Sequence, residues 1–188
     1  MGREFELKYA ATPEKQAAIA ARFGAFETIS METTYYDTAE RCLAERRITL
    51  RHRLENGKSV CTLKTPGTGS LRGEWEVENG NIGQGFAELC KLSGVELPDF
   101  AELKPICGAR FTRLAKVVSM DGCTVEIALD RGVLLGGGRE EPLCEVEVEL
   151  KTGKEDACLA FAAALAAEFD LRPEEKSKFK RALALTEI

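Results

Sequence analysis

Apolar and polar residues alternate with a period of two in eight separate stretches of this 188-residue chain. Because successive side chains of a β-strand point to opposite faces, this alternation predicts strands. Asn56-Gly57 and Asp121-Gly122 stand between neighbouring stretches and favour tight hairpins, which indicates antiparallel pairing. A closed sheet suits so many hairpin strands, so we predict an α+β fold: an eight-stranded antiparallel β-barrel with peripheral helices. The predicted strands are residues 3–9, 33–37, 47–55, 59–65, 71–78, 110–119, 124–130 and 142–151.

Other stretches have the spacing of amphipathic helices. Pro13 stands near the start of the first and Gly24 follows its end, and Gly94 follows the second, a pattern typical of helix ends. The third is rich in alanine, and Pro173 indicates the start of a last helix. We therefore predict helices at residues 13–23, 83–92, 155–169 and 173–185.

The chain shows no fixed-period repeat and no linker, so we expect a single domain over residues 1–188. The run Gly136-Gly137-Gly138 indicates a flexible hairpin tip. The alternative interpretation, a phosphate-binding loop, requires a strand-to-helix pattern with a following Lys-Ser/Thr, and that pattern is missing here.

Composition narrows the class of protein. The 26 Lys and Arg against 31 Asp and Glu give a formal charge of −5, which argues against coating of nucleic acid. No apolar run approaches the ~18 residues of a membrane span, and the first residues are charged, so we expect a cytoplasmic protein. With 7 cysteines in no CxxC pair and 1 histidine, zinc binding and Ser-His or Cys-His catalysis are disfavoured. Any chemistry then depends on carboxylates, amines and phenols.

Carboxylates recur at every second position near both ends of the chain. Glu4 and Glu6 share one face of the first predicted strand, and Glu145, Glu147 and Glu149 share one face of the last. Such a row can be only the solvated face of a half-buried strand. Crowded like charges, however, destabilise one another unless a cation offsets them. We therefore predict that the two rows meet and hold a hard divalent cation, Mg²⁺ or Mn²⁺.

Basic residues follow the same two-residue step. Arg51 and Arg53 share a strand face, Lys64 closes another strand, and Arg72 precedes Glu74 by two positions. Ordinary surface charge explains any one of these residues alone. Because they all follow the same two-residue step along their strands, we favour the interpretation that they face a common cavity. Arg binds phosphate oxygens in bidentate fashion and Lys adds a point charge, so such strands would hold a polyphosphate chain.

Taken together, these motifs resemble the CYTH, or triphosphate tunnel metalloenzyme, superfamily. Its first-strand motif ExExK stands at Glu4-Phe5-Glu6-Leu7-Lys8. The resemblance covers nearly the whole chain and implies an eight-stranded tunnel whose interior binds a triphosphate. The other matching motifs, in order, are TYYDT at 34–38, LRHR at 50–53, TLK at 62–64, RGEWE at 72–76, IALDRG at 127–132, CEVEVEL at 144–150 and EKSK at 175–178.

The resemblance also implies roles for individual residues. Lys64 would ready the attacking water together with Tyr35 or Tyr36. The implied metal ligands are Glu4, Glu6, Glu145, Glu147 and Glu149. The implied phosphate contacts are Lys8, Arg51, Arg53, Lys64, Arg72, Arg113 and, from the last helix, Lys176 and Lys178. Further acidic tunnel positions are matched by Glu74, Glu76 and Asp130.

The chain departs from the family pattern in two ways. A second basic residue often stands two positions before that of Arg113, but Phe111 is found here. Larger bacterial relatives append a histidine-rich helical domain that this sequence lacks, so we expect a stand-alone module that is a monomer or a homodimer.

The predicted function is metal-dependent hydrolysis of a small-molecule triphosphate, with tripolyphosphate converted to diphosphate and phosphate. Thiamine triphosphate and nucleoside triphosphates are alternative substrates. Cyclisation of ATP, as in class IV adenylate cyclases, is an alternative reaction. From a different class, the chain would bind polyphosphate or a nucleotide as a sensor without turnover, although five aligned carboxylates favour a hydrolase.

Overall fold

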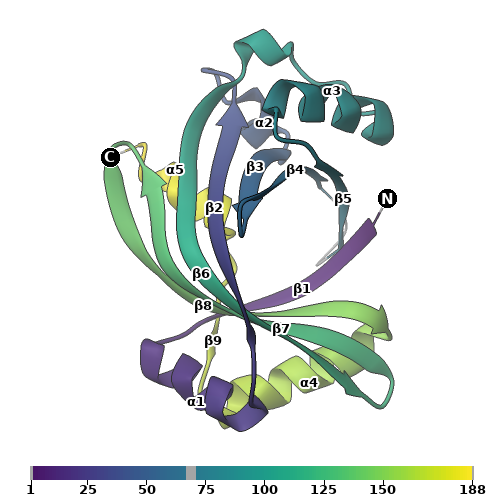
Figure 1. Ribbon diagram of the computed structural model, residues 1–188, viewed down its shortest axis with the longest axis vertical. Helices are drawn as coiled ribbons and strands as arrows, with labels where there is room; N and C mark the ends of the chain where they lie inside the picture. Colours follow the sequence, from purple (N-terminus) through teal and green to yellow (C-terminus); the bar gives the residue numbers. More distant parts are fainter. Residues whose placement is uncertain (1, 67–70, 188) are drawn as a thin grey trace.

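The computed structural model describes residues 2–66 and 71–187, and the side chains of 5–66 and 73–187. In these residues, nine strands form one antiparallel sheet in the order β5-β4-β3-β2-β6-β7-β8-β1-β9 (Figure 1). The eight predicted strands are all present. Their bounds are β1 Gly2–Ala10, β2 Glu27–Asp37, β3 Thr49–Glu55, β4 Lys58–Thr65, β5 Leu71–Glu78, β6 Lys104–Met120, β7 Cys123–Gly136 and β8 Arg139–Gly153. The ninth, β9, is the short Arg172–Pro173.

The sheet curls round until β1 meets both β5 and β8. Residues 2–5 of β1 pair with β5, and residues 6–10 pair with β8. Among the described residues, no residue of β1 pairs with both β5 and β8, so the seam differs from the regular closed barrel that the alternation predicts. The physical reason is that β1 crosses obliquely from one neighbour to the other, as Figure 1 shows. The result is still a hollow sheet with an inner and an outer face.

The helices begin and end at recognisable capping residues. Helix α1 (Pro13–Phe23) matches its predicted bounds, with the Thr12 side chain accepting from Lys15 N and Gly24 at φ 80° after the end. Helix α3 (Ile82–Ser93) is capped by Asn81. The others are α2 (Cys42–Glu45), which the sequence patterns missed, α4 (Glu155–Glu168) and α5 (Lys178–Ala184). Within the described residues, none of these helices has the length and apolarity needed to cross a bilayer.

The last helix is shorter than the predicted residues 173–185. Pro173 lies in β9, where it is the register partner of Tyr9. The helix begins instead after Ser177, whose side chain accepts from Lys180 N. The error arises because a proline suits the first turn of a helix and an edge strand equally well.

The two faces of the sheet carry opposite kinds of side chain. Helices α1 and α4 pack on the outer face of β1, β7 and β8 around Ile19, Ile127 and Leu165. Helix α3 covers the outer face of β3, β4 and β5 around Leu63 and Leu89. Beneath these helices the apolar residues of the alternating pattern therefore point outward, and charged residues such as Glu6, Arg51 and Glu149 point inward.

Helix α5 lies on the inner face instead, at one end of the hollow. Its Phe179, Ala182 and Leu185 pack against Phe111 of β6 and Leu134 of β7. This position brings the N-terminal end of α5, with Lys178, to the charged interior.

Candidate active site

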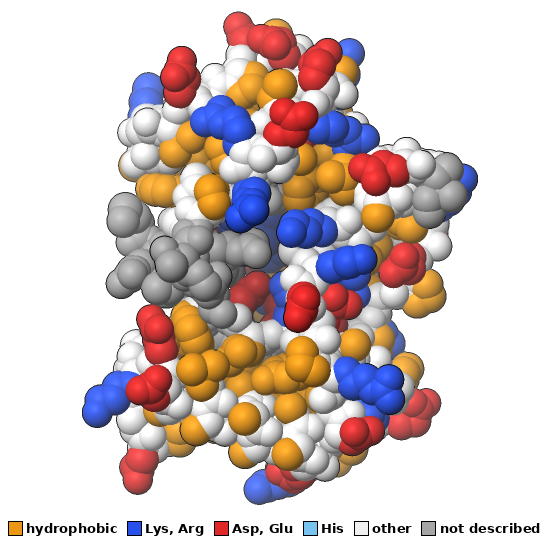
Figure 2. Space-filling view, turned by 180° about the vertical axis from the view of Figure 1, so that it is seen from behind, with side chains coloured by type: hydrophobic (Ala, Val, Ile, Leu, Met, Phe, Trp, Pro, Cys, Tyr) orange, Lys and Arg blue, Asp and Glu red, His pale blue; other side chains and the backbone are white. Residues whose placement is uncertain are grey.

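The interior of the sheet holds a cavity of about 310 Å³ whose lining is mostly charged. Figure 2 shows its opening: Lys and Arg side chains gather around a hollow, and Asp and Glu side chains lie below it. The lining residues are Glu6, Lys8, Ile29, Met31, Tyr35, Thr49, Arg51, Arg53, Glu55, Lys64, Glu74, Glu76, Arg113, Glu126, Glu147, Glu149, Lys151, Ser177, Lys178 and Phe179.

Three carboxylates of adjacent strands form what we call the outer row: Glu6 of β1, Glu149 of β8 and Glu126 of β7. Glu149 is the register partner of both others, so the three lie side by side across the sheet. Lys151 Nζ lies 3.0 Å from a Glu149 oxygen and 3.9 Å from a Glu126 oxygen, and Lys8 Nζ lies 3.5 Å from Glu6. In the described part of the site, two ammonium groups thus lie next to three carboxylates.

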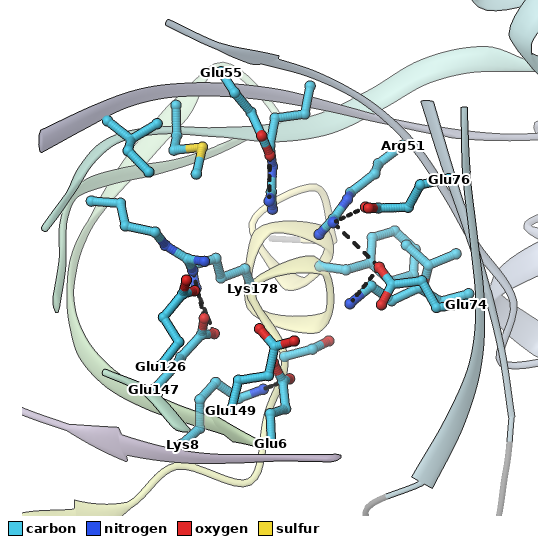
Figure 3. Close-up of a pocket in the computed structure, with 18 of the residues that line it drawn as sticks. Glu6, Lys8, Arg51, Glu55, Glu74, Glu76, Glu126, Glu147, Glu149 and Lys178 are labelled. Carbon is cyan, nitrogen blue, oxygen red and sulfur yellow. Dashed lines mark hydrogen bonds and ion pairs between the residues drawn. The ribbon is translucent and has the colours of Figure 1, made fainter. Parts of the chain in front are cut away.

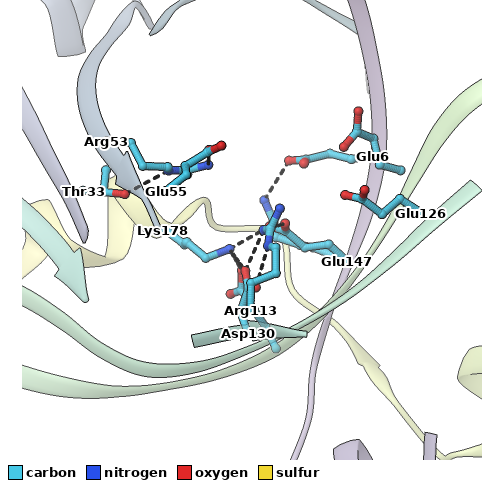
Figure 4. Close-up of polar contacts among 12 residues, drawn as sticks. Glu6, Thr33, Arg53, Glu55, Arg113, Glu126, Asp130, Glu147 and Lys178 are labelled. Atoms are coloured by element: carbon cyan, nitrogen blue, oxygen red, sulfur yellow. Dashed lines mark hydrogen bonds and ion pairs between the residues drawn. The ribbon is translucent and has the colours of Figure 1, made fainter. Parts of the chain in front are cut away.

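Deeper in the wall lies a second set of charges, the inner cluster, made of Asp130, Glu145, Glu147, Arg113, Lys178 and Arg181. Its three carboxylates each offer an oxygen within 4.8 Å of the others, a spacing at which one metal ion can be bound. Lys178 Nζ lies 2.7 Å from Asp130 and 2.8 Å from Glu147, and it also contacts Glu145 (Figure 4).

Arginines complete the inner cluster. The Arg113 guanidinium donates two hydrogen bonds of 2.8 Å to Asp130 and one of 2.5 Å to Glu147. Arg181 of α5 donates to Glu145. Burial alone would raise the pKa of Asp130 and Glu147, but Lys178 and Arg113 outweigh it and hold both pKa values below the usual range. The cluster is thus a buried network of ion pairs, in which the Nε of Arg181 has no hydrogen-bond partner among the described residues.

Glu145 differs from its two carboxylate neighbours. Burial raises the pKa of Glu145 to about 7, and Lys178 and Arg181 offset this only in part. Its side chain is fully buried and does not line the cavity. Behind it, the Gln16 amide of α1 donates to the backbone oxygens of Asp130 and Glu145, both at 2.9 Å. Helix α1 therefore supports the inner cluster from outside the sheet.

Across the cavity, Arg51 and Arg53 of β3 and Lys64 of β4 form the basic wall. Glu74 Oε1 lies 3.2 Å from Lys64 Nζ and 3.6 Å from Arg51 Nη2 (Figure 3). Glu76 lies 3.4 Å from Arg51. These two carboxylates of β5 thus lie next to the cations of the basic wall. The Glu76 side chain is 50% exposed, so solvent reaches this side of the cavity.

Arg53 is the most deeply placed cation of the basic wall. Its Nε donates to Thr33 Oγ1 at 3.0 Å, and Glu55 lies 3.5 Å from Nη1. Burial, and then the nearby Arg51 and Arg113, lower the pKa of Arg53 to about 10. Neighbouring cations thus disfavour one another here, and a bound anion would relieve that repulsion.

The two tyrosines of β2 point to different places. Tyr35 lines the cavity and stacks near Phe179, with ring centroids 5.1 Å apart. Burial raises the pKa of Tyr35, so its phenol stays protonated. Tyr36 packs instead beneath α3 with the outer apolar cluster. A register shift between them does not bring Tyr36 inside.

Most of the residues that the resemblance implies come together in this one cavity. Asp130 and Glu145 lie in the inner cluster behind it, and Lys176 is exposed and outside the lining. The side chains of Glu4 and Arg72 lie outside the described residues, so their predicted roles stay predictions. His52, between Arg51 and Arg53, does not line the cavity.

Several lining residues were missed at the level of sequence. Glu126, Glu55 and Lys151 are in phase with inward residues of their own strands, so the two-residue step could have found them. Ser177 and Phe179 reach the cavity only because α5 lies inside the sheet, and no local pattern signals that.

The donors of the outer row suit a hard divalent cation. All are carboxylate oxygens, the ligands that Mg²⁺ and Mn²⁺ prefer. Like charges directly opposite one another destabilise a sheet, and the side chains of Glu6, Glu126 and Glu149 are 23%, 21% and 30% exposed, within reach of ions from solvent. The chemistry of the row therefore fits the metal that the resemblance implies.

Comparison with known proteins identifies the family. The CYTH domain profile matches residues 2–183. The chain belongs to the CYTH family. A curated relative, the inorganic triphosphatase of Haemophilus influenzae, is 31% identical over 98% of this chain. This CYTH chain covers 55% of that relative's length.

Solved structures share the fold of this CYTH chain. The Hippeastrum protein HpAC1, described as a putative adenylyl cyclase with a dominant triphosphatase activity, has a TM-score of 0.68 and 17% identity, covering 99% of this chain and 97% of its own. A putative adenylate cyclase of Bacillus halodurans has a TM-score of 0.66 and 18% identity, with 96% and 98% covered. At these identities the likeness shows the antiparallel tunnel fold, as predicted.

Proposed function

We propose that this CYTH domain hydrolyses a triphosphate with the help of Mg²⁺ or Mn²⁺, and that tripolyphosphate is the preferred substrate. The observation that carries this proposal is one cavity with the outer row on one side and the basic wall on the other (Figure 3). The name of the Haemophilus relative, inorganic triphosphatase, supports the same reaction. The volume of about 310 Å³ suits a small anion.

The basic wall binds the phosphate chain. Arg51 and Arg53 present guanidinium groups that match phosphate oxygens in bidentate fashion, and Lys8 approaches from β1. The lowered pKa of Arg53 indicates a cation that gains from an anionic neighbour. Substrate oxygens would take over contacts that Glu74 and Glu76 now make with Arg51.

The outer row holds the metal. Glu6, Glu126 and Glu149 would be its protein ligands, and Glu126 is an addition to the set that the resemblance implies. When bound, the metal offsets charge on the phosphate oxygens. The carboxylates fix its place opposite the basic wall, so substrate is held between the two.

Lys64 and Tyr35 act on the attacking water. Lys64 is the register partner of Thr49, and Tyr35 is the register partner of Arg51, so both flank the same stretch of β3. Water attacks the terminal phosphorus. The bond between that phosphorus and the bridging oxygen breaks, and diphosphate leaves. Lys64 stabilises the charge that develops there, while the protonated Tyr35 orients the water.

The test is phosphate release from tripolyphosphate with Mg²⁺, Mn²⁺ or EDTA. We expect release with either metal and none with EDTA. Thiamine triphosphate and ATP are assayed in parallel, and faster turnover of either would replace tripolyphosphate as substrate. Binding without release would contradict hydrolysis and favour a sensor. Formation of a cyclic nucleotide from ATP would favour a cyclase.

A matched pair of variants locates the reaction in the cavity. Glu149→Gln removes one charge from the outer row, while Glu141→Gln removes one from an exposed position on the same strand. We expect Glu149→Gln to lower turnover about 100-fold, a typical effect of losing an electrostatic group at a reaction centre. Glu141→Gln should keep the native rate. Equal rates for the two variants would contradict the metal assignment.

A further inference from the structure

We propose that Lys178 acts as a built-in cation that keeps divalent metal out of the inner cluster, so that metal binds only at the outer row. The inference rests on the proposed metal role of the outer row. It assigns to Lys178 a positioning role that differs from a contact with substrate.

The first support is geometric. The three carboxylates of the inner cluster have the spacing of a metal site, and the Lys178 ammonium lies among them. An ammonium has three N–H donors, and Asp130, Glu145 and Glu147 each accept one contact. A metal ion could bind the same oxygens only after Lys178 had left.

The second support is charge. Lys178, Arg113 and Arg181 bring three positive charges to the three carboxylates of the inner cluster, and Arg181 also lies 3.5 Å from Glu174. A divalent ion added there would bring two further positive charges next to these buried cations, which is costly. Among the described side chains, the outer row has three carboxylates near two ammonium groups, and it reaches solvent.

The third support is the anchoring of Lys178. Its side chain is 7% exposed, and the helix that carries it is fixed by Phe179 and Ala182 in the inner apolar cluster. Arg181, one turn further along α5, contacts Glu145 as well. Withdrawing Lys178 would therefore require moving the end of α5, so the ammonium stays in place when metal reaches the cavity.

The experiment counts bound Mn²⁺ by titration calorimetry at about pH 8, where carboxylates are largely ionised, without substrate. Lys178→Met keeps the length of the side chain and removes its charge. We expect this variant to bind one more Mn²⁺ per chain than the native protein. Lys180→Met, an exposed position on the same helix, is the matched control and should bind the native number.

Two further variants, made in the native background, decide the question even if Lys178→Met does not fold. In the native background, Glu145→Gln should leave the Mn²⁺ affinity unchanged, whereas Glu126→Gln should weaken it at least 10-fold. In the Lys178→Met background, Glu145→Gln should remove the additional ion. The inference is overturned if folded Lys178→Met binds the native number of ions, or if Glu145→Gln weakens native binding as much as Glu126→Gln does. Absence of hydrolysis would contradict the proposed function alone, because this count needs no turnover.

Discussion

The inner cluster and the basic wall are both built from ion pairs, but they differ in burial. Asp130 and Glu145 have side chains with 0% exposure, and each contacts two cations. On the basic wall, Arg51 and Lys64 share Glu74 at 3.6 and 3.2 Å, next to the half-exposed Glu76. Breaking a pair at Asp130 or Glu145 leaves a charge in a medium of low polarity, whereas Glu74 and Glu76, which are 16% and 50% exposed, keep contact with water.

The comparison teaches that similar charged residues contribute to different properties. Substitutions in the inner cluster should mainly change the free energy of unfolding. Substitutions in the basic wall should mainly change turnover.

Arg113→Met should lower the free energy of unfolding by about 3–5 kcal/mol, because Asp130 and Glu147 lose their shared guanidinium inside the protein. Urea denaturation followed by circular dichroism measures the change. A loss below about 1 kcal/mol would show that the inner cluster is no more stabilising than an exposed pair.

Lys64→Ala should lower turnover of tripolyphosphate about 100-fold, equivalent to about 2.7 kcal/mol of transition-state stabilisation. The free energy of unfolding should fall by less than for Arg113→Met, because the Glu74 side chain is 16% exposed and keeps some contact with water, whereas Asp130 has 0% exposure. Steady-state kinetics and urea denaturation are measured on the same sample. A native rate with reduced stability would reverse the proposed division.

Gln16→Leu should cost about 2 kcal/mol of unfolding free energy, because two buried backbone oxygens lose the amide that donates to them. Hydrogen exchange should also accelerate at the amides of β7 and β8 next to Asp130 and Glu145. Unchanged exchange there would show that helix α1 does not support the inner cluster.

Arg110→Met should change the free energy of unfolding by no more than about 0.5 kcal/mol. Arg110 pairs with Glu140 at 3.2 Å, but the two side chains are 61% and 57% exposed. It lies on the same strand as Arg113, so urea denaturation of the two variants compares an exposed and a buried arginine directly. Similar losses would remove the contrast between the two regions.

The sequence patterns predicted the strands well because alternation is a local property. The apolar partner of each charged residue packs under a helix, so the same pattern that defines β1 and β8 also points Glu6 and Glu149 inward. Strands β6 and β7 run beyond their predicted ends because pairing with neighbours extends them past the regular alternation.

The alternation of residue types does not indicate how deeply an inward side chain is buried. Glu145, Glu147 and Glu149 follow one another at identical spacing, yet Glu145 is sealed by α5 and Glu149 faces the cavity. The difference arises from a helix that is distant in sequence and whose start the proline signal misplaced. Tyr35 and Tyr36 could not be separated either, because both fit the same motif and only the folded β2 fixes which face is inner.

The cavity lining among the described residues contains oxygen and charged nitrogen groups but neither a thiol nor an imidazole. Copper and cadmium favour sulfur and nitrogen donors, and among the described lining residues only the Met31 thioether is a soft donor. Cys61, Cys107 and Cys123 belong to the apolar clusters, away from that lining. The donor atoms of the cavity lining therefore favour hard ions over soft ions, whatever the size or charge of the ion.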